Sequence, residues 1–85
     1  MESNIFFVPD RSRFEWEIDG HLALAEFILE NGTITFTHTE VPKALGGRGI
    51  GSKLAAFVTS YAQNQGWKII PQCPFIKAYL EKHPL

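Results

Sequence analysis

The hydrophobic pattern of this chain changes its period at a glycine-rich segment, residues 46–51, and this change limits the folds open to it. Before the segment, apolar residues alternate with polar ones or form short runs, as they do in β-strands. After it, Ile50, Leu54, Phe57 and Val58 recur at spacings of three and four, as on one face of a helix. The sequence therefore predicts an α+β fold whose strands lie mainly in the first half.

Four strands are expected before the glycine-rich segment. Residues 5–8 form a short apolar run, and residues 14–19 alternate, with three carboxylates on the solvated face of an expected edge strand. Residues 22–30 are almost continuously apolar, which is typical of a strand covered on both faces. Gly20-His21 is expected to be the turn before it. Asn31-Gly32 is a strong hairpin signal, so residues 33–41 are expected to return antiparallel.

The second half predicts a helix, a short strand at 67–70, and a second helix opened by Pro74, with Cys73 as its N-cap. A strand–helix–strand succession favours a crossover. The strand at 67–70 is therefore expected to run parallel to 33–41 and to diverge from it where ligands bind. The predicted order is β-β-β-β-α-β-α in one domain over residues 1–85. Its sheet is mixed and antiparallel apart from one splayed parallel pair.

Composition argues against several classes of partner. The formal net charge is −1 without a run of lysine or arginine, which disfavours nucleic acid. No stretch approaches the roughly 20 apolar residues that span a membrane, and the start does not resemble a signal peptide. Cys73 is the only cysteine and the three histidines lack ligand spacing, so neither a disulfide nor a metal site is expected. A cytoplasmic protein, a monomer or a weak homodimer, is the expectation.

Residues 45–53, Leu-Gly-Gly-Arg-Gly-Ile-Gly-Ser-Lys, lie between a predicted strand and helix. Glycines let the backbone approach a ligand closely, and the unpaired amides of a helix N-terminus attract phosphate. Arg48, Ser52 and Lys53 add two positive charges and a hydroxyl. The serine–lysine order is wrong for a Walker loop, and the dinucleotide fingerprint lacks its third glycine. A loop without a ligand is the alternative, although four glycines within six residues are entropically costly to order.

The same segment resembles the acetyl-CoA loop of the GNAT superfamily of N-acetyltransferases, Q/R-x-x-G-x-G/A. Gly49 and Gly51 take its two small positions, while Gly46 replaces the usual glutamine or arginine. The resemblance to minimal GNAT proteins covers about 14–84 and includes His38-Thr39-x-Val41-Pro42 and Ile70-Pro71-x-Cys73-Pro74-Phe75. It implies transfer of acetyl from acetyl-CoA to an amine acceptor, which is a small molecule or a protein. The residues it assigns to acetyl-CoA are Thr39, Val41, Gly46, Gly47, Arg48, Gly49, Ile50, Gly51, Ser52 and Lys53.

Three residues are candidates for the chemistry. Cys73 stands where minimal GNAT proteins have an active-site candidate, and a helix N-terminus favours its thiolate. It is a nucleophile, a general base or a buried structural cysteine. His38 and Glu40 are expected on one strand face that points at the same opening, where either can act as a base. The alternative is a non-catalytic role, in which His38 makes a local hydrogen bond and Glu40 is solvated.

A second class of function stays open. The chain is short and leaves little sequence to shape an acceptor pocket. The alternative to an enzyme is therefore a module that binds CoA or acetyl-CoA as a sensor or subunit, without efficient turnover of its own.

Overall fold

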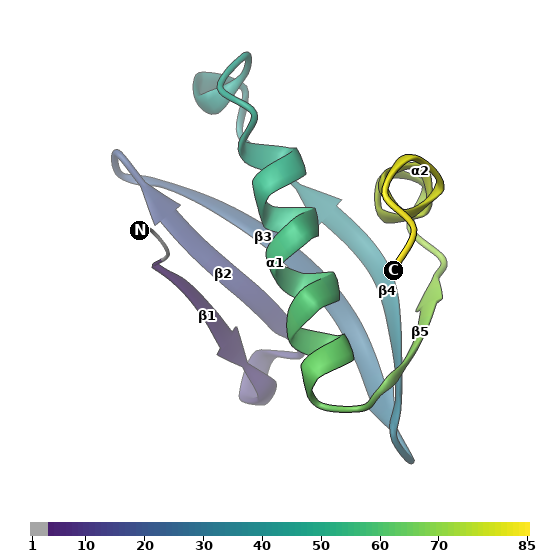
Figure 1. Cartoon of the computed structure of the whole chain (residues 1–85). Helices are drawn as coiled ribbons and strands as arrows, with labels where there is room; N and C mark the ends of the chain where they lie inside the picture. Colours follow the sequence, from purple (N-terminus) through teal and green to yellow (C-terminus); the bar gives the residue numbers. More distant parts are fainter. Residues whose placement is uncertain (1–3) are drawn as a thin grey trace.

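A computed structural model describes residues 4–85 and confirms the predicted α+β order (Figure 1). The sheet has the spatial order β1-β2-β3-β4-β5, and its neighbours are antiparallel except for the parallel pair β4–β5. The elements are β1 (Ile5–Val8), the 3₁₀ turn η1 (Pro9–Arg11), β2 (Arg13–Ile18), β3 (His21–Glu30), β4 (Thr33–Glu40), the 3₁₀ turn η2 (Lys43–Leu45), α1 (Ile50–Asn64), β5 (Lys68–Pro71) and α2 (Pro74–Lys82).

Two tight turns connect the antiparallel strands. Asn31 and Gly32 both have positive φ, 52° and 76°, which confirms the hairpin predicted there. The turn before β3 lies one residue earlier than expected. It uses Asp19 (φ 51°) and Gly20 (φ 77°), so His21 already belongs to β3. Asp19 is consequently a turn residue with an exposed side chain, and this side chain contacts Arg48 of the glycine-rich loop.

Both helices pack on the same side of the sheet. In Figure 1, α1 lies across the face formed by β2, β3 and β4, and α2 stands beside it near β4 and β5. The core buried between the helices and the sheet is mainly aliphatic and aromatic: Phe14, Phe27, Ile34, Phe36, Leu54, Ala55, Val58 and Ile76. Within residues 4–85, neither helix combines the length and the apolar character that crossing a membrane requires.

The other face of the sheet carries no helix in the described chain. On this face Ile28 is 52% exposed and Phe6 is 63% exposed. The expectation that β3 is covered on both faces is therefore wrong, because both helices pack against one side only. The expectation of an edge strand at 14–19 is wrong as well, since β2 pairs with β1 on one side and β3 on the other. Its glutamates do lie on the face without helices.

A β-bulge interrupts β4 and exchanges the faces to which its side chains point. Glu26 pairs with His38, whereas its neighbour Phe27 pairs with Phe36, so Thr37 is an extra residue on β4. Partners in an antiparallel pair point to the same face. Before the bulge, the even-numbered residues of β4 therefore face the helices, and after it the odd-numbered ones do.

Candidate functional site

The glycine-rich loop is shaped by two residues with positive φ. Gly47 has φ 78° and Gly49 has φ 71°, a conformation that costs other residues energy and that glycine adopts freely. Gly49 is the N-cap of α1 and makes no side-chain capping bond. The chain therefore turns sharply into the helix and leaves its N-terminus uncovered.

The first turn of α1 is an anion-attracting surface. The first intrahelical bond runs from Lys53 N to Gly49 O, 3.1 Å, so the amides of Ile50, Gly51 and Ser52 have no partner within the helix. The first turn contains no acidic side chain. Unpaired amides and the helix dipole together favour a bound phosphate there. This N-terminus would therefore fit a pyrophosphate.

An open pocket of about 280 Å³ lies over this helix start. It is lined by Val41, Leu45, Gly46, Gly47, Gly49, Ile50, Gly51, Ser52 and Phe75. The structure thus brings together the residues expected to bind acetyl-CoA, apart from Thr39, Arg48 and Lys53, which lie outside this lining. Its size is close to the lower end of ligand sites, and it continues toward β4 through Val41.

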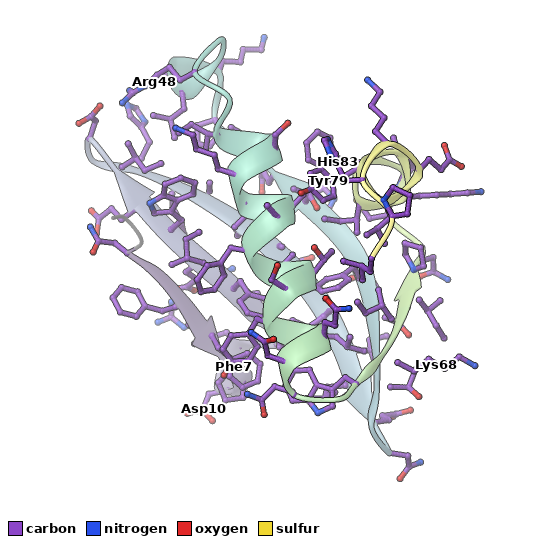
Figure 2. The ribbon with its side chains drawn as sticks, in the orientation of Figure 1. Phe7, Asp10, Arg48, Lys68, Tyr79 and His83 are labelled. Carbon is purple, nitrogen blue, oxygen red and sulfur yellow. The ribbon has the colours of Figure 1, made fainter. Side chains whose placement is uncertain are left out.

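Arg48 does not point freely into the pocket. Its Nη1 lies 2.8 Å from Oδ2 of Asp19 in the β2–β3 turn, in an exposed ion pair. Figure 2 shows Arg48 at the loop, at the opposite end of the molecule from Asp10. Asp19 was expected only on a solvated face, and no local sequence signal links it to a residue 29 positions later.

The parallel strands separate where the bulge begins. Pairing between β4 and β5 ends at Phe36 and Pro71, and Cys73 N then donates to Phe36 O at 2.7 Å. Beyond Phe36, the β5 side of β4 has no ladder partner in the described residues. The predicted divergence of this strand pair is thereby confirmed, and β4 has a free backbone edge that leads from Thr37 toward Val41 and the loop.

Cys73 lies beside this free edge, at the N-cap of α2 as predicted. Its Sγ lies 3.3 Å from Oγ1 of Thr39, to which the thiol donates. The side chain of Cys73 is only 4% exposed and belongs to the hydrophobic core. Thr39 contacts it because the bulge turns Thr39 toward the helices, where its partner Ala25 also points.

Opposing influences act on the Cys73 thiol. Burial by itself raises the pKa, because a thiolate is poorly solvated there. The Thr39 hydroxyl and the backbone of Ile76, Phe75 and Thr39 lower the pKa by favouring the thiolate. The net pKa lies below the ordinary value of 9.0. The thiol is thus easier to ionise than a free cysteine, although little of it is accessible.

His38 and Glu40 lie on the face of the sheet opposite to Cys73. Their partners on β3 are Glu26 and Leu24, which point away from the helices. The side chains are 56% and 63% exposed, and Nε2 of His38 is 3.9 Å from Oε1 of Glu40. The expectation that both face the same opening as Cys73 is wrong, because it assumed uninterrupted alternation along β4.

Phe75 lines the loop pocket, although no sequence pattern assigned it a functional role. Its ring lines the loop pocket and is 42% exposed. A Cβ on Gly51 would lie 2.8 Å from Cζ of Phe75, so the second small position of the loop motif also makes room for this ring. The proximity of Phe75 to the loop depends on how α2 packs against α1, which no local pattern specifies.

Comparison with known proteins agrees with this geometry. A family model described as GCN5-related N-acetyl-transferase matches residues 13–85, which include every element from β2 to α2. Protein NATD1 of Xenopus tropicalis is 30% identical over 89 residues, covering 98% of this chain and 81% of that protein. The glycine-rich loop, the splayed parallel strands and the family match lead to one conclusion: this chain belongs to the GCN5-related N-acetyltransferase family.

Proposed function

We propose that this protein transfers an acetyl group from acetyl-CoA to an amine, with the two substrates approaching from opposite faces of the sheet. Family membership supports acetyl transfer in general. The observation that carries the proposal is the free edge of β4 beyond Phe36, which connects the loop pocket to the gap between the parallel strands.

Acetyl-CoA would be held on the helix side. The amides of Ile50, Gly51 and Ser52 would bind its pyrophosphate, because they are unpaired and no carboxylate lies among them. Gly46, Gly47 and Gly49 would let the phosphates approach the backbone closely. The free edge of β4 near Thr39 and Val41 would receive the pantetheine arm by hydrogen bonds like those of an added strand.

The amine would approach on the face without helices. His38 and Glu40 point to this face at the edge of the strand gap, and both are accessible. A protonated amine is not nucleophilic, so one proton must leave it before the reaction. Either side chain can accept that proton, and the carboxylate of Glu40 also favours the approach of a cation.

The transfer itself balances without another reactant. The nitrogen attacks the thioester carbonyl carbon, the carbon–sulfur bond breaks, and CoA leaves as the thiol with the second proton of the amine. Cys73 is not an acetyl carrier in this proposal, because it is 4% exposed and its thiol is bonded to Thr39. Its part is to hold Thr39 and the end of the β4 edge in position.

A negative charge introduced at the N-terminus of α1 tests the proposed binding site. Ser52 is exposed in the first turn of α1, where a carboxylate stabilises a helix by about 0.3–1 kcal/mol. Ser52→Glu should therefore keep or raise the melting temperature and weaken acetyl-CoA binding at least about tenfold in calorimetry, since ~1.4 kcal/mol of repulsion suffices. Ser60→Glu, exposed in the same helix, is the matched control and should bind normally. Equal affinity in both variants contradicts the loop assignment.

Turnover is tested by chromatographic detection of CoA with a panel of amines: spermine, a lysine peptide, a free peptide N-terminus and an arylamine. His38→Gln, Glu40→Gln or the double variant should lower kcat by about 10²-fold. They should leave the affinity for acetyl-CoA unchanged, because they lie on the other face. An acetyl adduct on Cys73 in the intact mass would instead support the covalent route. Tight binding without turnover on any amine would favour the sensor or subunit alternative.

A further inference from the structure

A hollow of about 300 Å³ lies on the face of the sheet that carries no helix, over the start of β1 and the β2–β3 hairpin. It is lined by Asn4, Phe6, Glu15, Glu17 and Leu22. None of these residues lines the loop pocket, and none takes part in the proposed binding of acetyl-CoA. The hollow is therefore separate from the cofactor site.

The lining of this hollow offers a carboxylate and an aromatic ring to a cation. Glu15 already has partners, because its Oε2 lies 2.6 Å from Nε of Arg13 and 3.3 Å from Nη1 of Arg11. Glu17 is exposed, and among residues 4–85 no cation pairs with it. The ring of Phe6 is 63% exposed, and the face of such a ring attracts a cation. Glu17 and Phe6 can therefore bind one positive charge in the hollow.

A cross-strand row of side chains connects the hollow with the candidate bases. Phe6 pairs with Glu15, and Glu15 pairs with Leu24. Leu24 in turn pairs with Glu40, so the whole row points to the same face. Neighbouring strands lie about 4.8 Å apart, which places the Cα of Glu15 about 10 Å from that of Glu40, and the Cα of Glu17 about 12 Å from it. The row thus has a carboxylate on each side of an aliphatic side chain.

We infer that this hollow is a cation subsite for the acceptor, and that the acceptor is an aliphatic amine with a second ammonium group about 10–12 Å from the reacting nitrogen. The inference rests on the proposed function and names the class of its acceptor. The reacting nitrogen would lie at His38 and Glu40 and lose its proton there, while the second nitrogen stays protonated in the hollow. Only the reacting nitrogen forms a bond to the acetyl carbon, so the transfer balances as before.

The charge of this face argues against a second copy of the chain as the occupant. Two such faces would repel each other, because carboxylates outnumber the permanent cations on it. Among residues 4–85, the strand side chains that share this face include the acids Glu15, Glu17, Glu26, Glu30 and Glu40, and the bases Arg13 and Lys68. A cationic ligand complements this charge.

The test compares octylamine with octamethylenediamine as acceptors, by chromatographic detection of CoA at saturating acetyl-CoA. The two amines have the same carbon chain and differ in the second ammonium group. The KM of the wild type should be about tenfold lower for the diamine, the effect of one exposed ion contact together with one cation–π contact. Tetramethylenediamine is too short to reach from Glu40 to the hollow, and should gain nothing over butylamine.

Glu17→Gln should abolish the preference for the long diamine. It should raise the KM for octamethylenediamine about tenfold, and leave kcat and the KM for octylamine unchanged. Glu30→Gln is the matched control, because Glu30 is exposed on the same face but lies at the other end of β3 from Leu22. It should keep the full preference. Equal losses in both variants would show a general electrostatic attraction and overturn the subsite.

The two proposals fail in different ways. If the wild type acetylates no amine of this set or of the panel above, the proposed function fails and the cation subsite fails with it. If it acetylates octylamine and octamethylenediamine with the same KM, acetyl transfer stands and only the subsite is overturned. Thermal unfolding of both variants is measured alongside, because Glu17 and Glu30 are exposed and neither change should alter stability.

Discussion

Arg48 and Asp19 form an ion pair that joins the glycine-rich loop to the β2–β3 turn, with Nη1 and Oδ2 2.8 Å apart. Both side chains are well exposed, so the pair itself contributes about 0–1 kcal/mol to stability. Its larger effect concerns binding: Arg48 has to leave Asp19 before it can contact a phosphate in the neighbouring pocket.

Asp19→Asn should therefore tighten acetyl-CoA binding by about threefold, since releasing Arg48 removes a competition worth under ~1 kcal/mol. Asp10→Asn removes the same charge at the far end of the sheet and should change the affinity less (Figure 2). Titration calorimetry of both variants at equal ionic strength measures this. Weaker binding in Asp19→Asn would mean that the ion pair holds the loop in its binding conformation.

Gly49 is expected to be required for its backbone conformation alone. Its φ is 71° and an added Cβ would meet no atom within 4 Å. Gly49→Ala should therefore lower the free energy of unfolding by about 1 kcal/mol, the cost of a left-handed alanine. Gly49→Asn should be milder, because asparagine tolerates this region and is a good N-cap. Urea unfolding measures the stability of both variants against the wild type. A Gly49→Ala variant as stable as the wild type would contradict the strain assigned to a left-handed alanine.

Gly51 and Phe75 should be energetically coupled. Gly51→Ala gains helix propensity but forces the Phe75 ring aside, because Cζ lies 2.8 Å from the new Cβ. In a Phe75→Ala background the same change should raise the free energy of unfolding, because only the gain remains. A double-mutant cycle by urea unfolding should give a coupling of about 1 kcal/mol. Additive effects would show that the ring moves away without cost.

The lowered pKa of Cys73 predicts a pH-dependent contribution to stability. A group whose pKa is lower in the folded state stabilises that state once pH exceeds the ordinary value, here 9.0, and loses this effect as pH falls through the folded pKa. The stability advantage of the wild type over Cys73→Ser should therefore grow between pH 7 and pH values above the ordinary one. Urea unfolding across this range measures it, and a difference that shrinks with rising pH would reverse the assigned direction.

Much of the fold could be predicted because its signals are local. The Asn31-Gly32 hairpin, the period of α1, and the position of Cys73 at the start of α2 each depend on neighbouring residues. For the glycines of the loop, the residue type alone also predicts the backbone conformation. The binding half of the candidate site could therefore be named residue by residue, although its role stays a prediction.

The faces of the strands could not be predicted in the same way. The bulge at Thr37 places Thr39, rather than His38, beside Cys73. A single extra residue in a strand exchanges its two faces, and the residues around Thr37 give no sequence signal for a bulge. The alternation rule therefore failed at the site, where the candidate bases were assigned to the wrong face.

Local patterns along the chain are sufficient for the order of the elements, the shape of the loop at 46–51 and the direction of β5, because turn residues, hydrophobic period and the crossover rule act over short distances. Three other features exist only in the folded molecule: Asp19 contacts Arg48, Phe75 covers Gly51, and both helices lie on one face of the sheet. These contacts join residues far apart in the chain, and they follow from how the elements pack to bury a common core. Local patterns do not contain that information.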